Sequence, residues 1–398
     1  MKNTFLTLAI ASMLLISCGE DDTADIIINN TDNSITNNTT GDTTNPNAGQ
    51  AINISGTYVQ DLTLEAKNQY TLNGALVMAE GTTLTIEAGT IIEALAAGSD
   101  IYIAIAQGAK IQANGNANEP IIMTSNSSTP QAGDWGGLII LGKAPINSVA
   151  TGTSTSEIGG LPYGGTDAAD NSGTIRYVRV QYSGGKADGQ SENNGFSFYG
   201  VGNSTTVEYI QMFEGLDDGL EFFGGTVNVS YVSVVNAQDD SIDWTEGYTG
   251  TITNAYVKHG VDHDKGFECD GYNTDIGNNS NPLYFSKPTV LNVTIVGLGS
   301  ETGNEAVRLR AGTQGIFTNF VIEGFNEGFD LDGDQANNPT GQGVIDGDLD
   351  VTDITFTDVI LKMKNDTEFT FTEADFISGD GNGTGTDYAS WGANWTVE

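Results

Sequence analysis

Apolar and polar residues alternate with a period of two in a short phrase that recurs through the second half of the chain. The apolar positions are held by pairs such as Leu220 and Phe222, and a charged residue, here Glu221, lies between them. A period of two predicts a β-strand with one face directed inward and the other outward. The clear copies, preceded by one fainter copy at Gly195, are centred on small residues at Gly219, Ser241, Gly266, Ala306 and Gly328.

The copies recur at a nearly constant interval. The steps between their small residues are 24, 22, 25, 40 and 22 residues. A recurrence of this length is typical of a solenoid, in which each repeat is one coil stacked on the previous coil. The 40-residue step predicts a coil that carries an insertion, and we place this insertion at residues 272–287, which are rich in Asn and Gly.

A second apolar stretch follows each phrase after a turn that usually contains Gly, as at Val227, Val229 and Tyr231. Two or three short strands fill each repeat, so no room remains for crossover helices. The pattern predicts an all-β protein, a right-handed parallel β-helix (a solenoid) over residues 51–398. A β-propeller or sandwich is the alternative, but propeller blades repeat at roughly 40 to 45 residues, which matches only the longest step.

The charge balance excludes one class of partner. The chain has 14 Lys and Arg against 52 Asp and Glu, a formal net charge of −38. Nucleic acid binding needs clustered cations, so we expect no nucleic acid partner. Dispersed acidic residues on a solvated face are one explanation of the charge, and an ordered acidic site in the repeats is the other. The two cysteines, Cys18 and Cys269, allow no disulfide framework.

The N-terminal segment has the features of a secretory signal: Lys2, a short apolar run to Ile16, and a small residue. Residues 15–18 (Leu-Ile-Ser-Cys) resemble the bacterial lipobox, which implies a signal peptide over residues 1–17 and a lipidated Cys18. The acidic residues 20–22 resemble the export tag of Bacteroidota-type surface lipoproteins. Residues 18–50 then read as the lipidated Cys and a flexible tether. We therefore expect a lipid-anchored, surface-exposed outer-membrane protein whose only membrane contact is the lipid.

Residues 60–398 resemble a largely uncharacterised family of bacterial surface β-helix lipoproteins. The resemblance rests on EGTTLTIEAGTII (residues 80–92), GAKIQANG (108–115), PIIMTS (120–125) and DWGGLIILGKAPIN (134–147). It also rests on the closing Trp-Gly-x-x-Trp-Thr at residues 391–396. The resemblance implies the β-helix fold and the location, and it supplies no activity.

Stacking of the repeats predicts columns of carboxylates. Equivalent residues of neighbouring coils lie about 4.8 Å apart, so Glu221, Asp243 and Glu268 should form one outward row that Arg308 and Asp330 continue. Such a row needs a divalent cation, an arginine or a proton to offset repulsion, or its side chains turn outward into solvent. Calcium takes six to eight oxygen ligands, and the candidate Ca²⁺ ligands are Asp217, Asp218, Glu221, Asp239, Asp240, Asp243, Asp264, Glu268, Asp270, Asp330 and Asp332.

This face could bind a ligand or catalyse a reaction. The preferred hypothesis is a calcium-supported binding module for an extracellular polysaccharide or a surface protein, with Arg308 and Arg310 as partner-binding candidates. The alternative is a calcium-dependent polysaccharide lyase or a glycoside hydrolase. A glycosidase needs two carboxylates at a set separation, and a lyase needs a base, for which Lys265 is the candidate.

Two further patterns bear on function. Asp239-Asp240, His259-Gly260 and residues 308–310 resemble the polygalacturonase arrangement, although the Asn-x-Asp phrase of that family is missing. With His259 and His263 as the only histidines, a His-rich transition-metal site is not expected. The aromatic residues that could form either a sugar-stacking platform or part of the core are Tyr163, Tyr182, Tyr199 and Phe223.

The lipid anchor is testable. Cys18→Ala should release or mislocalise the protein, because the thiol and the new amino group of Cys18 would carry the acyl chains. Fractionation of cells, with surface proteolysis of the wild type, measures this. A Cys18→Ala variant that still partitions fully with the outer membrane would contradict the prediction.

Overall fold

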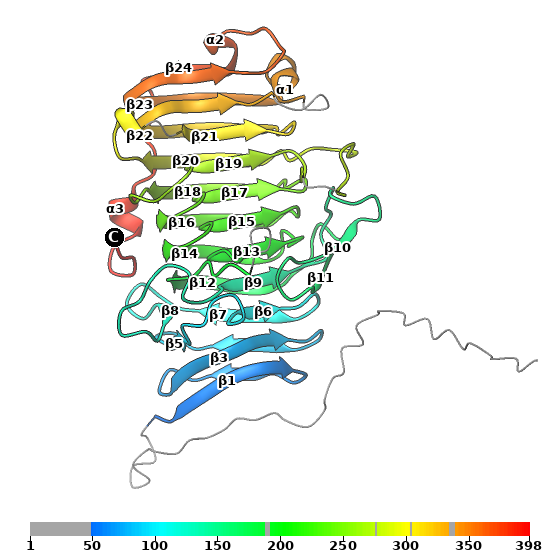
Figure 1. The fold of residues 1–398 in the computed structure, drawn as a ribbon, viewed down its shortest axis with the longest axis vertical. Coiled ribbons are helices and arrows are strands. Elements are labelled where there is room, and N and C mark those ends of the chain that lie inside the picture. The colour runs from blue at the N-terminus through cyan, green and yellow to red at the C-terminus, as the bar shows by residue number, and fades with distance from the viewer. Residues whose placement is uncertain (1–48, 188–191, 275–276, 303–304, 334–338) are drawn as a thin grey trace, which may run out of the picture. The chain divides into compact units, whose positions relative to one another are not determined.

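The computed structural model describes residues 49–187, 192–274, 277–302, 305–333 and 339–398. Within these residues the strands stack one above another as successive coils, and 22 of them form one continuous sheet (Figure 1). The predicted signal peptide, the predicted lipidation site Cys18 and nearly all of the predicted tether lie outside the described residues. Among the described residues, no helix is long and apolar enough to cross a membrane.

The first coils come from short strands. They are β1 (Ala51–Tyr58), β2 (Leu62–Leu64), β3 (Gln69–Met78), β4 (Thr83–Ile86), β5 (Ile91–Ala94), β6 (Ile103–Ile105), β7 (Lys110–Asn114), β8 (Ile121–Ser125) and β9 (Leu138–Leu141). A small antiparallel hairpin, β10 (Thr153–Thr155) and β11 (Pro162–Gly164), interrupts the sequence of coils before the next long strand.

Along residues 173–331, long strands and short strands alternate. The long strands are β12 (Gly173–Gln181), β14 (Thr206–Gly215), β16 (Asn228–Ala237), β18 (Thr251–Lys258), β20 (Thr289–Val296), β22 (Gly315–Leu331) and β23 (Leu349–Asn365). The short strands are β13 (Phe196–Tyr199), β15 (Leu220–Phe223), β17 (Ile242–Thr245), β19 (Phe267–Asp270), β21 (Glu305–Arg310) and β24 (Ile377–Asp380). The helices are α1 (Thr340–Asp346), α2 (Glu373–Phe376) and α3 (Tyr388–Trp391), with a 3₁₀ turn at Ser300–Thr302.

The predicted parallel β-helix is confirmed. From β13 to β21 each short strand pairs in parallel with the short strand of the next coil, and Glu221, Asp243 and Glu268 are register partners as predicted. A propeller or sandwich would need antiparallel blades or two packed sheets, whereas every pairing in the 22-stranded sheet is parallel. The insertion is also confirmed, because β19 ends at Asp270, β20 begins at Thr289, and the described residues between them contain no strand.

The apolar positions of the recurring phrase form the core. Phe222 and Trp244 are fully buried, and so are their equivalents in the neighbouring coils. Aromatic rings stack along this interior, with 5.2 Å between the ring centroids of Phe198 and Phe222 and 4.4 Å between those of Phe222 and Tyr248. Cys269 is buried in the same interior as a free thiol, where it packs as a small apolar residue.

One edge of the β-helix turns at a non-glycine residue in the left-handed region of backbone conformation. The residues at this bend, which lie above one another in successive long strands, are Tyr177, Tyr209, Tyr231, Asn254, Asn292, Asn319 and Asp353. Asn and Asp tolerate this conformation best, and the three tyrosines offset its cost by stacking at 4.3 and 4.2 Å.

The last residues of the chain, 381–398, form a strap across this bend. The indole of Trp395 packs edge-on against Tyr177 and Tyr209, at centroid distances of 5.5 and 6.2 Å. Arg179 Nη1 donates to the carbonyl of Trp395 at 2.6 Å, and Gln211 Nε2 donates to the carbonyl of Val397 at 2.7 Å. In Figure 1 the segment that carries α3 lies alongside the long strands of the middle coils. The closing Trp-Gly-x-x-Trp-Thr motif therefore ties together coils that are distant in the sequence.

The strap makes the stability of the β-helix depend on its final residues. Trp395→Ala removes a fully buried side chain and should lower the free energy of unfolding by about 3 to 5 kcal/mol. Glu398→Gln is the matched control, because its ion pair with Lys258 is solvent-exposed and worth at most about 1 kcal/mol. Denaturant unfolding measures both, and a Trp395→Ala variant as stable as the control would contradict the role of the strap.

Candidate functional site

Two columns of polar residues run along the outer face of the short strands. The first lies just before each strand, where Asp240 N donates to Asp218 Oδ1 at 2.9 Å and Lys265 N donates to Asp240 Oδ1 at 2.8 Å. Its members are Asn194, Asp218, Asp240, Lys265, Glu305 and Glu327. The second column is the predicted row within the strands, and its members are Ser197, Glu221, Asp243, Glu268, Arg308, Asp330 and Lys364.

Two residues further along the same strands, further pairs lie in register. Phe223 pairs with Thr245, and Asp270 pairs with Arg310. Asp332 has a basic partner, because Arg308 Nε donates to Asp332 Oδ2 at 3.1 Å.

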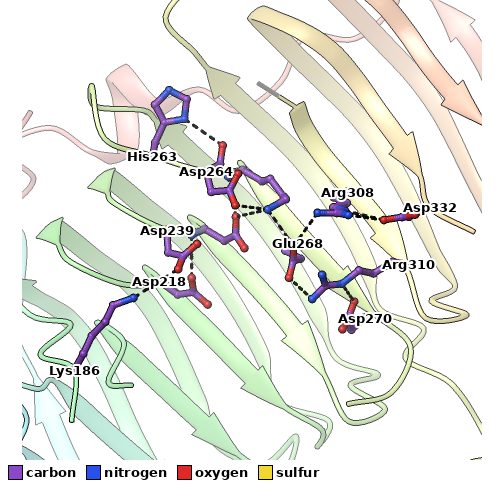
Figure 2. A network of polar contacts seen from close by, with 12 residues as sticks. Lys186, Asp218, Asp239, His263, Asp264, Glu268, Asp270, Arg308, Arg310 and Asp332 are labelled. Carbon is purple, nitrogen blue, oxygen red and sulfur yellow. Dashed lines mark hydrogen bonds and ion pairs between the residues drawn. The ribbon is translucent and has the colours of Figure 1, made fainter. Parts of the chain in front are cut away.

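Three basic residues, Lys265, Arg308 and Arg310, form a basic belt across the acidic columns. Figure 2 shows the two arginines beside Glu268. Lys265 Nζ lies 3.1 Å from Glu268 Oε1 and 3.8 Å from Asp240 Oδ1. Arg310 binds Glu268 through Nη2 and Asp270 Oδ1 through Nε, the latter at 2.6 Å. The belt divides the face into two acidic zones, one on the side of β15 and β17 and the other on the side of β21 and β22.

The larger zone is the floor of a groove with a volume of about 340 Å³. Loops from two insertions contribute to its lining, Glu157 from the hairpin segment and Asn273 with Thr274 from the loop after β19. Its other lining residues are Glu192, Asp217, Asp218, Glu221, Phe223, Asp239, Asp240, Asp243, Thr245, Glu268, Asp270 and Arg310. Most of the predicted calcium ligands are therefore brought together in one concave site.

Within the groove, Asp218, Glu221 and Asp243 form a cluster that we call the groove triad. Each offers a carboxylate oxygen within 4.8 Å of the other two. Among the described residues, no Lys or Arg nitrogen lies within 4.0 Å of these three carboxylates. Lys186 Nζ instead forms ion pairs with Asp217 at 3.1 Å and Asp239 at 3.8 Å.

The members of the groove triad differ in their hydrogen bonds. Asp218 accepts the amide of Asp240, and Glu221 Oε2 accepts from Asn194 Nδ2 at 2.7 Å. Asp243 Oδ1 is buried and has no hydrogen-bond partner in the structure, and the same holds for Thr245 Oγ1 beside it. The middle of the groove therefore presents oxygen atoms that still need a donor, a proton or a cation.

Burial and crowding raise the pKa of these carboxyls. For Asp218, Glu221 and Asp243 burial is the main cause, and a neighbouring carboxylate is the next. Burial also raises the pKa of Asp217 to about 8, against the influence of Lys186. It raises the pKa of Asp270 to about 7, against the influence of Arg310. The groove therefore retains protons at neutral pH when no cation neutralises it.

The basic belt behaves in the opposite way. Burial alone would lower the pKa of Lys265, but Asp240 and Glu268 outweigh burial and raise it above its ordinary value. Burial is likewise outweighed at Arg310, where Asp270 and Glu268 raise the pKa. Lys265 has a side chain only 6 % exposed, so its ammonium is held in ion pairs and remains protonated.

The remaining predicted residues lie elsewhere. Asp264 is an ion-pair partner of Lys265 at 2.5 Å, and its side chain is mostly exposed. Asp330 lies beyond the basic belt, in the second acidic zone. His259 is buried behind the face and does not line the groove, and burial lowers its pKa to about 3. The polygalacturonase-like arrangement thus shares the Asp pair and Arg310 with the groove but not the histidine.

Three of the four aromatic candidates serve packing, and the fourth, Tyr182, is half-buried beside Phe213. Tyr163, Tyr199 and Phe223 are buried in a second hydrophobic cluster between the sheet and the insertion before β12. The rings of Tyr199 and Phe223 stack at 3.9 Å, and Tyr163 Oη donates to Glu246 Oε2 at 2.8 Å. The interpretation of these residues as core is the one that the structure supports.

Sequence reasoning missed the groove residues that come from loops and turns: Glu157, Glu192, Asn194, Asn273 and Thr274. They lie outside the strands, so the period of two does not indicate their direction. The sequence signal that could have indicated the loop residues was the interruption of the repeat, because both the hairpin segment and the loop after β19 border the acidic face.

The fold can now be compared with known proteins. A family model described as "Pectate-lyase like beta helix domain" matches residues 56–396. The chain belongs to this family. The comparison with curated proteins found no match. Among solved structures, the catalytic unit of the thermostable GH87 α-1,3-glucanase from Streptomyces thermodiastaticus strain HF3-3 has 10 % identity and a TM-score of 0.38. The match covers 88 % of this chain and 64 % of that one, less than two thirds of its length, and a TM-score this low carries no argument about function.

The raised pKa values predict a pH dependence of stability. The folded state binds these protons more tightly than the unfolded chain does, so the unfolding free energy is greatest below the ordinary carboxyl pKa of 3.8 and falls as pH rises. For Asp217 and Asp270 the loss is complete above about pH 8 and about pH 7. Denaturant unfolding from pH 4 to 9 in chelator measures this contribution.

Asp243→Asn is the sharpest variant for this test. It removes a buried carboxyl of the groove triad whose ionisation at rising pH costs stability, and should raise the unfolding free energy at pH 8 by on the order of 1 kcal/mol. Asp332→Asn, the matched control, removes a carboxylate that is paired with Arg308 and should destabilise. If Asp243→Asn destabilises as much as Asp332→Asn does, the groove triad does not carry unrelieved repulsion.

Proposed function

We propose that the groove binds a polysaccharide and that the chain acts as a glycoside hydrolase. Membership of a pectate-lyase-like family supports a carbohydrate-directed function and favours catalysis over the binding module that the sequence first suggested. The groove is bordered by two insertions, and its floor is formed by stacked strands of several coils. This arrangement suits a polymer that contacts several coils at once. The finer assignment rests on the carboxylates at its floor.

The hydrolase proposal rests on the pair of carboxyl groups formed by Glu221 and Asp243. They are register partners on adjacent strands, and their carboxylate oxygens lie within 4.8 Å of each other. Retaining glycosidases place an acid and a nucleophile about 5 Å apart. Asn194 donates to Glu221 and favours its ionised form, whereas Asp243 has a buried oxygen without a donor. We therefore assign the nucleophile to Glu221 and the general acid to Asp243.

In this assignment Asp243 gives its proton to the glycosidic oxygen while Glu221 attacks the sugar carbon, so that the bond to the leaving group breaks as the bond to Glu221 forms. Asp243, now ionised, then takes a proton from a water molecule. The water oxygen attacks the sugar carbon, and the bond between the sugar and Glu221 breaks. Burial and the neighbouring Glu268, which is ion-paired with Lys265 and Arg310, raise the pKa of Asp243 and so favour its protonated form in the resting state.

The structure favours hydrolysis over elimination. A lyase needs a Lys or Arg that can accept the proton beside a uronate. Lys265 and Arg310 are each held by two or more carboxylates, and their pKa values are raised. An anionic uronate would also meet the repulsion of the groove carboxylates, so a neutral polysaccharide fits this site better.

A calcium-supported binding module is the second candidate, because the groove triad has no basic partner. Two oxygens on opposite sides of a bound Ca²⁺ are separated by about 4.6 to 5.2 Å, and the triad oxygens lie within 4.8 Å. Asp218, Glu221 and Asp243 would hold the ion, which would neutralise the floor and offer a ligand position to a sugar oxygen. In both proposals the protein is anchored by lipid at the outer membrane.

The two candidates separate in one experiment. Purified protein is incubated with a panel of neutral and acidic polysaccharides, with calcium or with chelator, and new reducing ends and retained glycan are measured. The hydrolase proposal expects products from a neutral glycan, and Asp243→Asn should lower the rate by about 10² to 10⁴. Asp262→Asn, an exposed carboxylate outside the groove, is the control and should leave the rate unchanged.

The outcomes are distinct. An Asp243→Asn variant as active as the control would refute the role of Asp243, and products that absorb in the ultraviolet would indicate a lyase instead. Retention of glycan without products, lost with chelator and in Asp243→Asn, would support the binding module. In that case calcium should raise the melting temperature of the wild type and not that of Asp243→Asn.

A further inference from the structure

Beyond the basic belt, the second acidic zone contains a cluster that the groove does not include. Glu305 on β21 pairs in register with Glu327 on β22, and Asp330 lies three residues further along β22. Each of the three offers a carboxylate oxygen within 4.8 Å of the other two. We call these residues the distal triad.

Two oxygens of the distal triad have no donor among the described residues. Glu305 Oε2 and Asp330 Oδ1 are buried and accept no hydrogen bond, and the buried Glu327 Oε2 has only Lys364 Nζ near it, at 3.6 Å. Asp330 is only 4 % exposed, so water does not freely solvate its carboxylate. A buried carboxylate oxygen that faces two others is costly unless something positive lies between them.

Lys364 compensates only part of this charge. Its Nζ lies 3.2 Å from Asp330 Oδ2 and 3.6 Å from Glu327 Oε2, and it also pairs with Asp366 at 3.1 Å. One ammonium is therefore shared by three carboxylates, and it reaches Asp330 through the oxygen that is not orphaned. Arg308, the register partner of Asp330, is turned to Asp332.

We propose that the distal triad binds a divalent cation, and that Ca²⁺ is the ion that fits. The donor set is oxygen only, which excludes the nitrogen and sulfur preferences of zinc. Oxygens within 4.8 Å of one another fit around Ca²⁺, whose metal–oxygen distance is about 2.3 to 2.6 Å, and leave room for water ligands. Mg²⁺ would need them closer, at about 4.2 Å or less across the ion.

This site differs from the groove in its consequence. It links β21 to β22 across one step of the solenoid, outside the residues that line the groove. A cation there stabilises the coil boundary and does not depend on whether the groove binds or cleaves a glycan. The proposal is therefore independent of the proposed function.

Equilibrium dialysis and calorimetric titration with CaCl₂ test the site in the full chain. Glu327→Gln should bind one Ca²⁺ fewer than the wild type, or bind that ion at least tenfold more weakly. Asp243→Asn alters only the groove and should keep the distal ion, and Asp262→Asn should match the wild type. Lys364→Gln removes the competing ammonium and should bind the distal ion more tightly.

Each result decides the question. Equal calcium stoichiometry and affinity in folded Glu327→Gln and wild type would overturn the proposal, even if Asp243→Asn loses an ion. A wild type that binds no calcium, with Glu327→Gln more stable at pH 8, would overturn it by showing that protons alone relieve the triad. If Glu327→Gln does not fold, Glu305→Gln replaces it, and a crystal grown with Mn²⁺ should show an anomalous peak between the three carboxylates.

Discussion

Parallel stacking places the same position of successive coils about 4.8 Å apart, and nearly every feature of the outer face follows from that constraint. On the inward side the constraint is favourable, because aromatic residues such as Phe198, Phe222 and Tyr248 stack on one another. On the outward side it forces Glu221 beside Asp243 and Asp243 beside Glu268. Like charges at this distance repel by about 1 kcal/mol in water and by more where solvent is excluded.

The chain answers this repulsion in three ways. Where a cation occupies the next coil, as Lys265 and Arg308 do, the column alternates in sign and the carboxylates are satisfied. Where the carboxylate can reach the backbone of the next coil, as Asp218 reaches the amide of Asp240, it caps that coil. Neither solution reaches Asp243 Oδ1, Glu305 Oε2 or Asp330 Oδ1, which have no hydrogen-bond partner among the described residues. Those positions must take up a proton or a cation, and they are the places where chemistry or ligand binding is expected.

The strands and the columns could be predicted from the sequence because both follow from local periodicity. The alternation around Leu220 fixes which residues face outward, and the repeat step fixes that Glu221, Asp243 and Glu268 share a row. What could not be predicted was the direction of each long side chain. Lys265 was a candidate base by composition, yet it lies in ion pairs with Asp240, Asp264 and Glu268. That result depends on which carboxylates surround it in space, and the repeat step does not specify this.

The loops and the C-terminus show a second limit of periodicity. Glu157 and Asn273 reach the groove from insertions, and Trp395 reaches Tyr177 across more than two hundred residues of sequence. A solenoid has mostly neighbour-to-neighbour contacts, so a long-range contact such as the strap couples coils that would otherwise unfold separately. The bend that the strap covers is also where tyrosines adopt a strained backbone conformation. The strap therefore stabilises the strained edge of the β-helix and leaves the acidic face open, which allows that face to keep carboxylates that lower the stability of the fold.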